Sequence, residues 1–157
     1  MWKTAIALVT VACLASTTDA QNCPIGGITT TDVGQATGFL QPSRLILTWD
    51  AANCRLGVEV SAFSCCNTYA SQHFIVFGDQ LLATPVALGR PFFAGSQLYV
   101  RRAQIYGPLP LITTFDVPPD PSLVGQTFVA QAAPVYFTTI GFRTSYAMTQ
   151  GVVFTFQ

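Results

Sequence analysis

Short stretches in which apolar and polar residues alternate, separated by glycine and proline corners, constrain the fold of this chain more than any other feature. Leu56, Val58 and Val60, for example, alternate with smaller or polar residues. This spacing is typical of a strand with one buried face. No long stretch keeps apolar residues at helical spacing behind an N-terminal cap. The pattern therefore predicts strands rather than helices.

Eight strands are expected from this pattern. They lie within residues 44–50, 55–63, 73–77, 98–105, 111–117, 127–132, 138–147 and 152–156. Corners rich in Gly, Pro, Asn and Asp separate them, at residues 50–53, 77–79, 88–91, 106–108 and 118–121. Because closely spaced short strands with turns between them favour layered antiparallel sheets, we expect an antiparallel β-sandwich, jelly-roll-like and stabilised by disulfides. Residues 29–41 show little pattern and are expected to form a loop.

The first twenty residues differ in composition from the rest. Lys3 supplies one positive charge, residues 4–15 are nearly all apolar, and small or polar residues lead to Ala20. This order predicts a signal peptide over residues 1–20, and a single secreted or cell-surface domain over residues 21–157. The apolar run is shorter than the roughly 20 residues that a membrane-spanning helix needs. No later run is long enough either, so no transmembrane segment is expected.

The charge of the chain is low and balanced. Seven basic and seven acidic residues give a net charge of zero, and removal of Lys3 and Asp19 leaves six of each. A neutral chain argues against a nucleic-acid partner. Charged residues make up 9% of the chain, against about 25% in an average domain. Weak electrostatic repulsion favours a protein that packs against itself, a cell-surface polymer or a glycan.

Four cysteines follow the predicted signal peptide: Cys23, Cys54, Cys65 and Cys66. An even number in an exported chain predicts disulfides. If residues 55–63 form a straight strand, its ends are too far apart for Cys54 to reach Cys65 or Cys66. Cys23 would then pair with Cys54, and the adjacent cysteines would bond each other or stay reduced. If the strand is bent, Cys23 and Cys54 would each bond one of the adjacent pair.

The sequence offers little for catalysis, metal binding or a cofactor. His73 is the sole histidine, and neither a C-x-x-C nor a G-x-S-x-G motif is present. Most acidic residues fall at predicted turns, where Asp serves backbone hydrogen bonds; Asp116 and Asp120 are the pair that could converge on calcium. We therefore assign no catalytic residue, no metal ligand and no cofactor. A hydrolase, the least favoured alternative, would depend on His73.

Aromatic residues beside predicted corners are the candidates for ligand binding. Trp49 and Tyr106 could offer flat rings to a sugar, although aromatic residues in strands more often belong to the core. The favoured function is a secreted, non-catalytic structural or adhesive module that acts at the cell exterior by self-association or surface packing. A carbohydrate-binding module is the alternative.

Roughly residues 55–157 resemble a known group of proteins, and the specific part of the resemblance is confined to residues 116–132. The segment 116–132, with its run of Pro118, Pro119 and Pro121 and its ending in Ala-Gln-Ala, and the closing strand 151–156 carry the resemblance. They are similar to the tail of small exported bacterial β-sandwich domains of uncharacterised function. The resemblance implies export and a β-sandwich, and it assigns no catalytic residue. Those domains often carry a cysteine where Gln97 stands, so their disulfide pattern is not transferred.

Overall fold

A computed structural model describes residues 23–157. Within this range the chain has eleven strands, one short 3-10 helix and no α-helix. The strands are β1 (Ile28–Val33), β2 (Arg44–Asp50), β3 (Arg55–Ser61), β4 (Thr68–Gly78), β5 (Gln80–Ala87), β6 (Gln97–Arg101), β7 (Gln104–Pro110), β8 (Ile112–Asp116), β9 (Thr127–Thr138), β10 (Arg143–Tyr146) and β11 (Gly151–Phe156). The predicted signal peptide, residues 1–20, lies outside the described residues.

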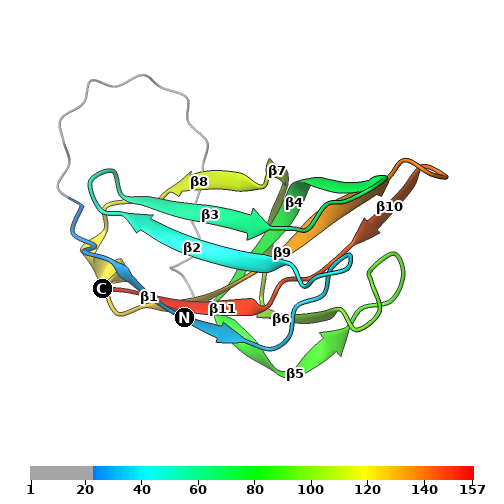
Figure 1. Cartoon of the computed structure of the whole chain (residues 1–157). Coiled ribbons are helices and arrows are strands. Elements are labelled where there is room, and N and C mark those ends of the chain that lie inside the picture. The colour runs from blue at the N-terminus through cyan, green and yellow to red at the C-terminus, as the bar shows by residue number, and fades with distance from the viewer. Residues whose placement is uncertain (1–22) are drawn as a thin grey trace.

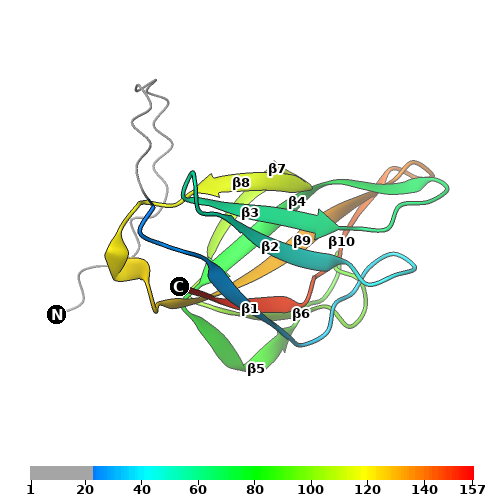
Figure 2. The same cartoon turned by 60° about the vertical axis from the view of Figure 1, so that its left-hand side comes forward.

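The strands form two facing antiparallel sheets and a separate two-stranded ribbon. The larger sheet has the order β1–β11–β9–β4–β7, with β10 paired to the far end of β9, and the smaller sheet has the order β2–β3–β8. The smaller sheet lies over the larger one (Figures 1 and 2). One of the crossings between the two sheets is at Leu111, whose carbonyl accepts a hydrogen bond from the Val60 amide. The predicted antiparallel β-sandwich is confirmed, with more strands than expected.

The main core lies between the two sheets. It contains Leu45, Leu56, Val58 and Val60 of the smaller sheet and Ile75, Ala130, Ala132, Val152, Phe154 and Phe156 of the larger one. Beside the small Ala130 and Ala132, the Phe77 ring centroid lies 5.4 Å from that of Phe115 and 6.3 Å from that of Phe154. Because each fully buried apolar side chain contributes about 1.5–3 kcal/mol, this interface is the main source of stability.

The ribbon of β5 and β6 covers the other face of the larger sheet. Val100 of β6 packs against Val76 of β4 and Val129 of β9 in a second, smaller cluster. Every residue of β9 from Val129 to Pro134 is therefore buried. The sequence predicted that every second residue of this strand would be buried. Because the ribbon covers the face opposite the main core, the residues on both faces of the strand are buried.

The buried Gln131 side chain connects β9 to β6 and to the segment that precedes β11. Its Oε1 accepts a hydrogen bond of 2.9 Å from the Tyr99 amide of β6. Its Nε2 donates to the carbonyl oxygens of Gln97, at 2.8 Å, and Thr149, at 2.9 Å. The side chain of Gln131 thus makes hydrogen bonds to three backbone groups. These groups lie on two segments that are not paired with β9 as strands.

The segment between β10 and β11 continues this polar network towards the smaller sheet. The Thr149 hydroxyl accepts a hydrogen bond from the Ala132 amide and donates one to the Gln150 carbonyl, both at 2.9 Å. The Gln150 side chain accepts from the Leu45 amide, at 3.3 Å, and donates to the Leu45 carbonyl, at 3.0 Å. Since β2 is an edge strand, Gln150 supplies the partner that its open side would otherwise lack.

Several predicted element boundaries were wrong. Residues 98–105 are two strands, because Arg102 has a φ of 52° and turns the chain between β6 and β7. Residues 106–108 form part of β7 rather than a corner. β7 is an edge strand, where Pro108 removes no ladder hydrogen bond, and the register with β4 shifts at this point.

Two strands were missed because they show no apolar alternation. Residues 29–41, expected to be a loop, contain most of β1, which pairs with β11 from Ile28 opposite Phe156 to Val33 opposite Gly151. Its threonines are exposed, so no buried face is visible in the sequence. β5 is exposed along nearly its whole length and contains Pro85, which hides it in the same way.

The cysteines pair in one of the predicted arrangements. Cys23 and Cys54 form a disulfide, with Cα atoms 5.4 Å apart. Cys65 and Cys66 are free thiols, which is the reduced alternative that the sequence left open for the adjacent pair. β3 is extended between Cys54 and the adjacent pair, as the preferred pairing required.

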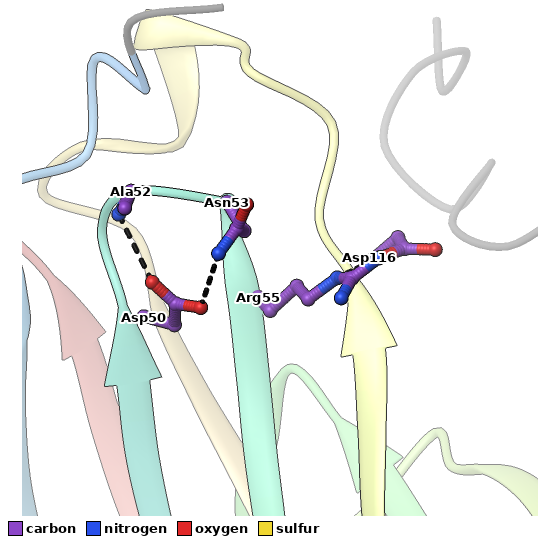
Figure 3. A network of polar contacts seen from close by, with 5 residues as sticks. All are labelled: Asp50, Ala52, Asn53, Arg55 and Asp116. Atoms are coloured by element: carbon purple, nitrogen blue, oxygen red, sulfur yellow. Dashed lines mark hydrogen bonds and ion pairs between the residues drawn. The ribbon is translucent and has the colours of Figure 1, made fainter. Parts of the chain in front are cut away.

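The corner between β2 and β3 is built from the turn residues that the sequence predicted there. Asp50 accepts hydrogen bonds from the Ala52 amide, at 3.1 Å, and the Asn53 side chain, at 2.7 Å (Figure 3). The Asn53 hydrogen bond, followed by those from the backbone, lowers the pKa of Asp50. Arg55 and Asp116 form an exposed ion pair of 2.8 Å across β3 and β8. Both contacts are structural.

The Gln131 hydrogen bonds should contribute strongly to stability. Replacing Gln131 by Leu leaves the Tyr99 amide and the carbonyls of Gln97 and Thr149 unsatisfied, so we expect the free energy of unfolding to fall by about 3 kcal/mol. Gln41→Leu, at an exposed position, is the control and should change it by less than about 0.5 kcal/mol. Urea denaturation measures both, and equal losses would contradict the role of Gln131.

Candidate distal contact site

Two turns form one end of the sandwich, which we call the distal end. They are residues 62–67, between β3 and β4, and residues 139–142, between β9 and β10. The Thr139 amide donates a 2.9 Å hydrogen bond to the Asn67 carbonyl, and the hydroxyls of Thr68 and Thr138 are hydrogen-bonded at 3.1 Å below it. Both views show the two turns side by side, away from the C-terminus (Figures 1 and 2).

Large apolar side chains are exposed at the distal end. Phe142 is 82% exposed and Ile140 is 69% exposed. Phe142 has the highest exposed fraction of any large apolar side chain in the described part of the chain. Phe63, in the other turn, is also exposed. Because apolar side chains at the tip of a hairpin contribute nothing to the core, the distal end is the candidate contact surface.

A shallow groove lies beside the distal end. It has a volume of about 420 Å³ and is lined by Arg90, Pro91, Phe92, Phe93, Arg143, Thr144 and Ser145. Backbone hydrogen bonds hold its two sides together, from the Phe93 amide to the Tyr146 carbonyl, at 2.8 Å, and from the Tyr146 amide to the Pro91 carbonyl, at 3.2 Å. The Phe92 and Tyr146 rings are 5.4 Å apart between centroids.

The groove is positively charged. Arg90 and Arg143 are both exposed, and no acidic residue lines the groove. The ion pairs found among residues 23–157 involve Arg55 and Arg102 instead. Two guanidinium groups beside aromatic rings and hydroxyls suit an anionic ligand, since arginine binds carboxylates and sulfates in a planar, two-point manner.

The two free thiols lie in the turn of the distal end that precedes β4. Cys65 is half-buried and Cys66 is exposed. Paired hydrogen bonds between the backbones of Cys65 and Thr68, at 3.0 and 2.9 Å, close the turn. The hydrogen bond to Cys66, followed by burial, raises the pKa of the Cys65 thiol. The adjacent thiols therefore contact each other at the surface.

The two residues predicted to bind a ligand lie at the edges of the core. Trp49 is half-buried; its Nε1 donates a 3.0 Å hydrogen bond to the Ile25 carbonyl, and its ring lies 5.4 Å from that of Phe156. Tyr106 is half-buried between the rings of Phe77 and Phe115, at 6.0 and 5.8 Å. The structure does not bring Trp49 and Tyr106 together.

His73 is buried in the sheet, and no nucleophile of the described residues is hydrogen-bonded to its ring. Its side chain is 0% exposed, and it stands opposite Leu109 of β7 and Pro134 of β9. Neither ring nitrogen makes a hydrogen bond within residues 23–157. Burial lowers the pKa of His73, an effect that the nearby Pro110 carbonyl only partly opposes. The residue on which a hydrolase would depend is thus enclosed by the fold.

Asp120 and Asp116, the predicted pair, each make a contact of their own. The Ser122 amide, donating to Asp120 at 2.8 Å, lowers the pKa of that carboxyl and fixes the short helix at Pro121–Leu123. Asp116 is paired with Arg55. Among the described residues no three His, Cys, Asp or Glu side chains are grouped to hold a metal ion.

Comparisons with family models, with curated proteins and with solved structures find no match. The resemblance of residues 116–132 to exported bacterial domains therefore remains a prediction. Residues 23–157 contain no helix with the length and apolar character needed to cross a membrane.

The distal end was not visible in the sequence. Ile140 and Phe142 lie within residues 138–147, which were expected to be a weak strand, and an apolar residue in a strand is assigned to the core by default. The available signal was Gly141 between them, which has a φ of 78° and makes the turn. A glycine flanked by apolar residues between two strands marks a hairpin tip.

The buried His73 should make stability depend on pH. The folded state keeps His73 neutral, whereas the unfolded chain takes up a proton below pH about 6.5. Because the unfolded state then binds more protons than the folded state, the free energy of unfolding should fall on acidification, by up to about 1.4 kcal/mol per pH unit. Above that pH, His73 should cause no such loss. His73→Leu should flatten this dependence. Urea denaturation between pH 5 and pH 8 measures it, and parallel curves would contradict it.

Proposed function

We propose that this chain is a secreted, non-catalytic adhesive module that acts by self-association or surface packing through its distal end. The observation that carries the proposal is the exposure of Phe142 and Ile140 on a turn that hydrogen-bonds to its neighbour. The turn residues 62–67 and 139–142 include no charged side chain. A contact there requires no charge to be desolvated.

The magnitudes favour a weak, reversible contact. Burying Phe142 and Ile140 of two copies contributes about 1.5–3 kcal/mol per side chain, while association costs at least about 4 kcal/mol in lost freedom of motion. The balance corresponds to a dissociation constant on the order of micromolar to millimolar. The net charge of zero removes long-range repulsion between copies.

Secretion is part of the proposal. It is supported by the signal-like residues 1–20 and by the Cys23–Cys54 disulfide, a bond that is rare in reducing compartments. The many exposed threonines of β1 give a polar but weakly charged surface, which suits close packing at the cell exterior.

Substitutions at the distal end should weaken self-association. Phe142→Ser with Ile140→Thr removes the apolar contact, so we expect the dissociation constant to rise at least about tenfold. Ile112→Thr is the matched control, since Ile112 is 72% exposed but lies on β8, outside the distal end. Sedimentation equilibrium of the mature protein in reducing buffer measures all three proteins. A wild type that stays monomeric, or a control that loses association equally, would contradict the proposal.

A carbohydrate-binding module is the second candidate, and the arginine groove favours it. The groove combines two guanidinium groups, two aromatic rings and hydroxyl groups, which are the groups needed to bind an acidic sugar. The candidate ligand is therefore an acidic glycan. Trp49 and Tyr106 play no part in this version of the hypothesis, because their rings pack against the core.

Charge removal in the groove tests this second candidate. Arg90→Gln with Arg143→Gln should weaken the binding of an oligogalacturonate at least about tenfold, since each ion pair with a desolvated carboxylate contributes on the order of 1 kcal/mol or more. Arg44→Gln on β2 is the control, outside the groove. Calorimetry at two salt concentrations measures the affinity, which should fall as salt rises. Unchanged affinity in the double variant would exclude the groove.

A further inference from the structure

The free thiols have no suitable partner within their own described chain. Cys54 is bonded to Cys23, so Cys65 and Cys66 are left with each other. Adjacent Cα atoms across a trans peptide bond are about 3.8 Å apart, whereas disulfides usually span about 4.4–6.8 Å between Cα atoms. The backbone hydrogen bonds between Cys65 and Thr68 hold the turn in its present shape. Closing a ring between neighbours would strain this turn.

Exposure distinguishes the two cysteines. Cys66 is the outer residue of the turn, with a φ of 56° and an exposed side chain, while Cys65 is half-buried. The hydrogen bond to Cys66, followed by burial, raises the pKa of the Cys65 thiol. Because an incoming disulfide must be able to reach the attacking sulfur, the exposed Cys66 is the thiol that reacts with it.

We propose that Cys66 forms an intermolecular disulfide with Cys66 of a second copy of this chain. This inference rests on the proposed function, in which the chain is exported and self-associates through the distal end. Cysteines without an intramolecular partner in a secreted protein indicate pairing between molecules. The disulfide would convert a weak contact into a permanent one.

The surroundings of Cys66 favour a second copy as the partner. Asn67 follows Cys66 directly, and its carbonyl accepts the hydrogen bond from Thr139, next to the exposed Ile140. A two-fold symmetric contact places the same patch on both sides, so Ile140 and Phe142 of each copy can cover those of the other. Arg143 lies at the base of the hairpin, where the two copies can keep it at the solvated rim.

The chemistry balances with a low-molecular-weight disulfide as the oxidant. The Cys66 thiolate of one copy attacks the small disulfide, forms a mixed disulfide and releases one small thiolate. The Cys66 thiolate of the second copy then attacks the Cys66 sulfur of the first and releases the other small thiolate. Two protein thiols are oxidised, and one small disulfide is reduced to two thiols.

The test uses the full mature chain in a glutathione and glutathione disulfide buffer. Wild type and Cys65→Ser should form a dimer that survives denaturing electrophoresis and disappears with dithiothreitol. Cys66→Ser should form at least about tenfold less. Cys66→Asn, whose side chain suits the left-handed φ at this position, is the second variant and should behave in the same way. Mass spectrometry should find the Cys66–Cys66 linked peptide.

Three outcomes would overturn the inference: a monomer with a Cys65–Cys66 disulfide, a monomer carrying only glutathione on Cys66, or a dimer linked through Cys65. Sedimentation in reducing buffer separates this inference from the proposed function. Reversible association that depends on Phe142, without a Cys66 cross-link after oxidation, would contradict the disulfide alone. A Cys66 cross-link without any reversible association would contradict the adhesive function alone.

Discussion

The buried side chains of Gln131, Thr149 and Gln150 provide the polar contacts on which the arrangement of the sheets depends. They bind backbone groups of β6, β9 and the edge strand β2, which belong to three different sheets. Hydrophobic burial drives the layers together but does not fix their relative position, since apolar contacts are non-directional. A fully satisfied buried network does fix it, because any displacement leaves buried polar groups unpaired.

This fixed arrangement explains how the distal end can present apolar side chains without collapsing onto the core. β9 is buried on both faces along its middle, and it extends beyond the covered region as one side of the β9–β10 hairpin. The hairpin is joined to the turn before β4 through Thr139 and Asn67. Ile140, Phe142 and Cys66 therefore lie on two turns that a hydrogen bond holds together. A contact surface needs such rigidity.

The sequence predicted the fold class and the Cys23–Cys54 pairing, because alternation and the reach of an extended strand are local physical properties. It missed β1 and β5, whose exposed residues show no apolar face, and it divided the chain wrongly around Arg102, where one residue with positive φ separates two strands of different sheets. It placed Ile140 and Phe142 in a strand, whereas they lie in the turn between β9 and β10. Which apolar side chains a sheet covers depends on tertiary packing, which periodicity does not encode.

The most direct test of this account is amide hydrogen exchange at Tyr99, Leu45 and Ala132. Each of these amides donates to a side chain of the network rather than to a neighbouring strand. If the network holds the sheets in place, all three amides should be as strongly protected as the amides of the β4–β9 ladder, and they should exchange only when the whole domain unfolds. Exchange at the rate of exposed loops would show that the sheets are held by apolar packing alone, and the central claim would be wrong.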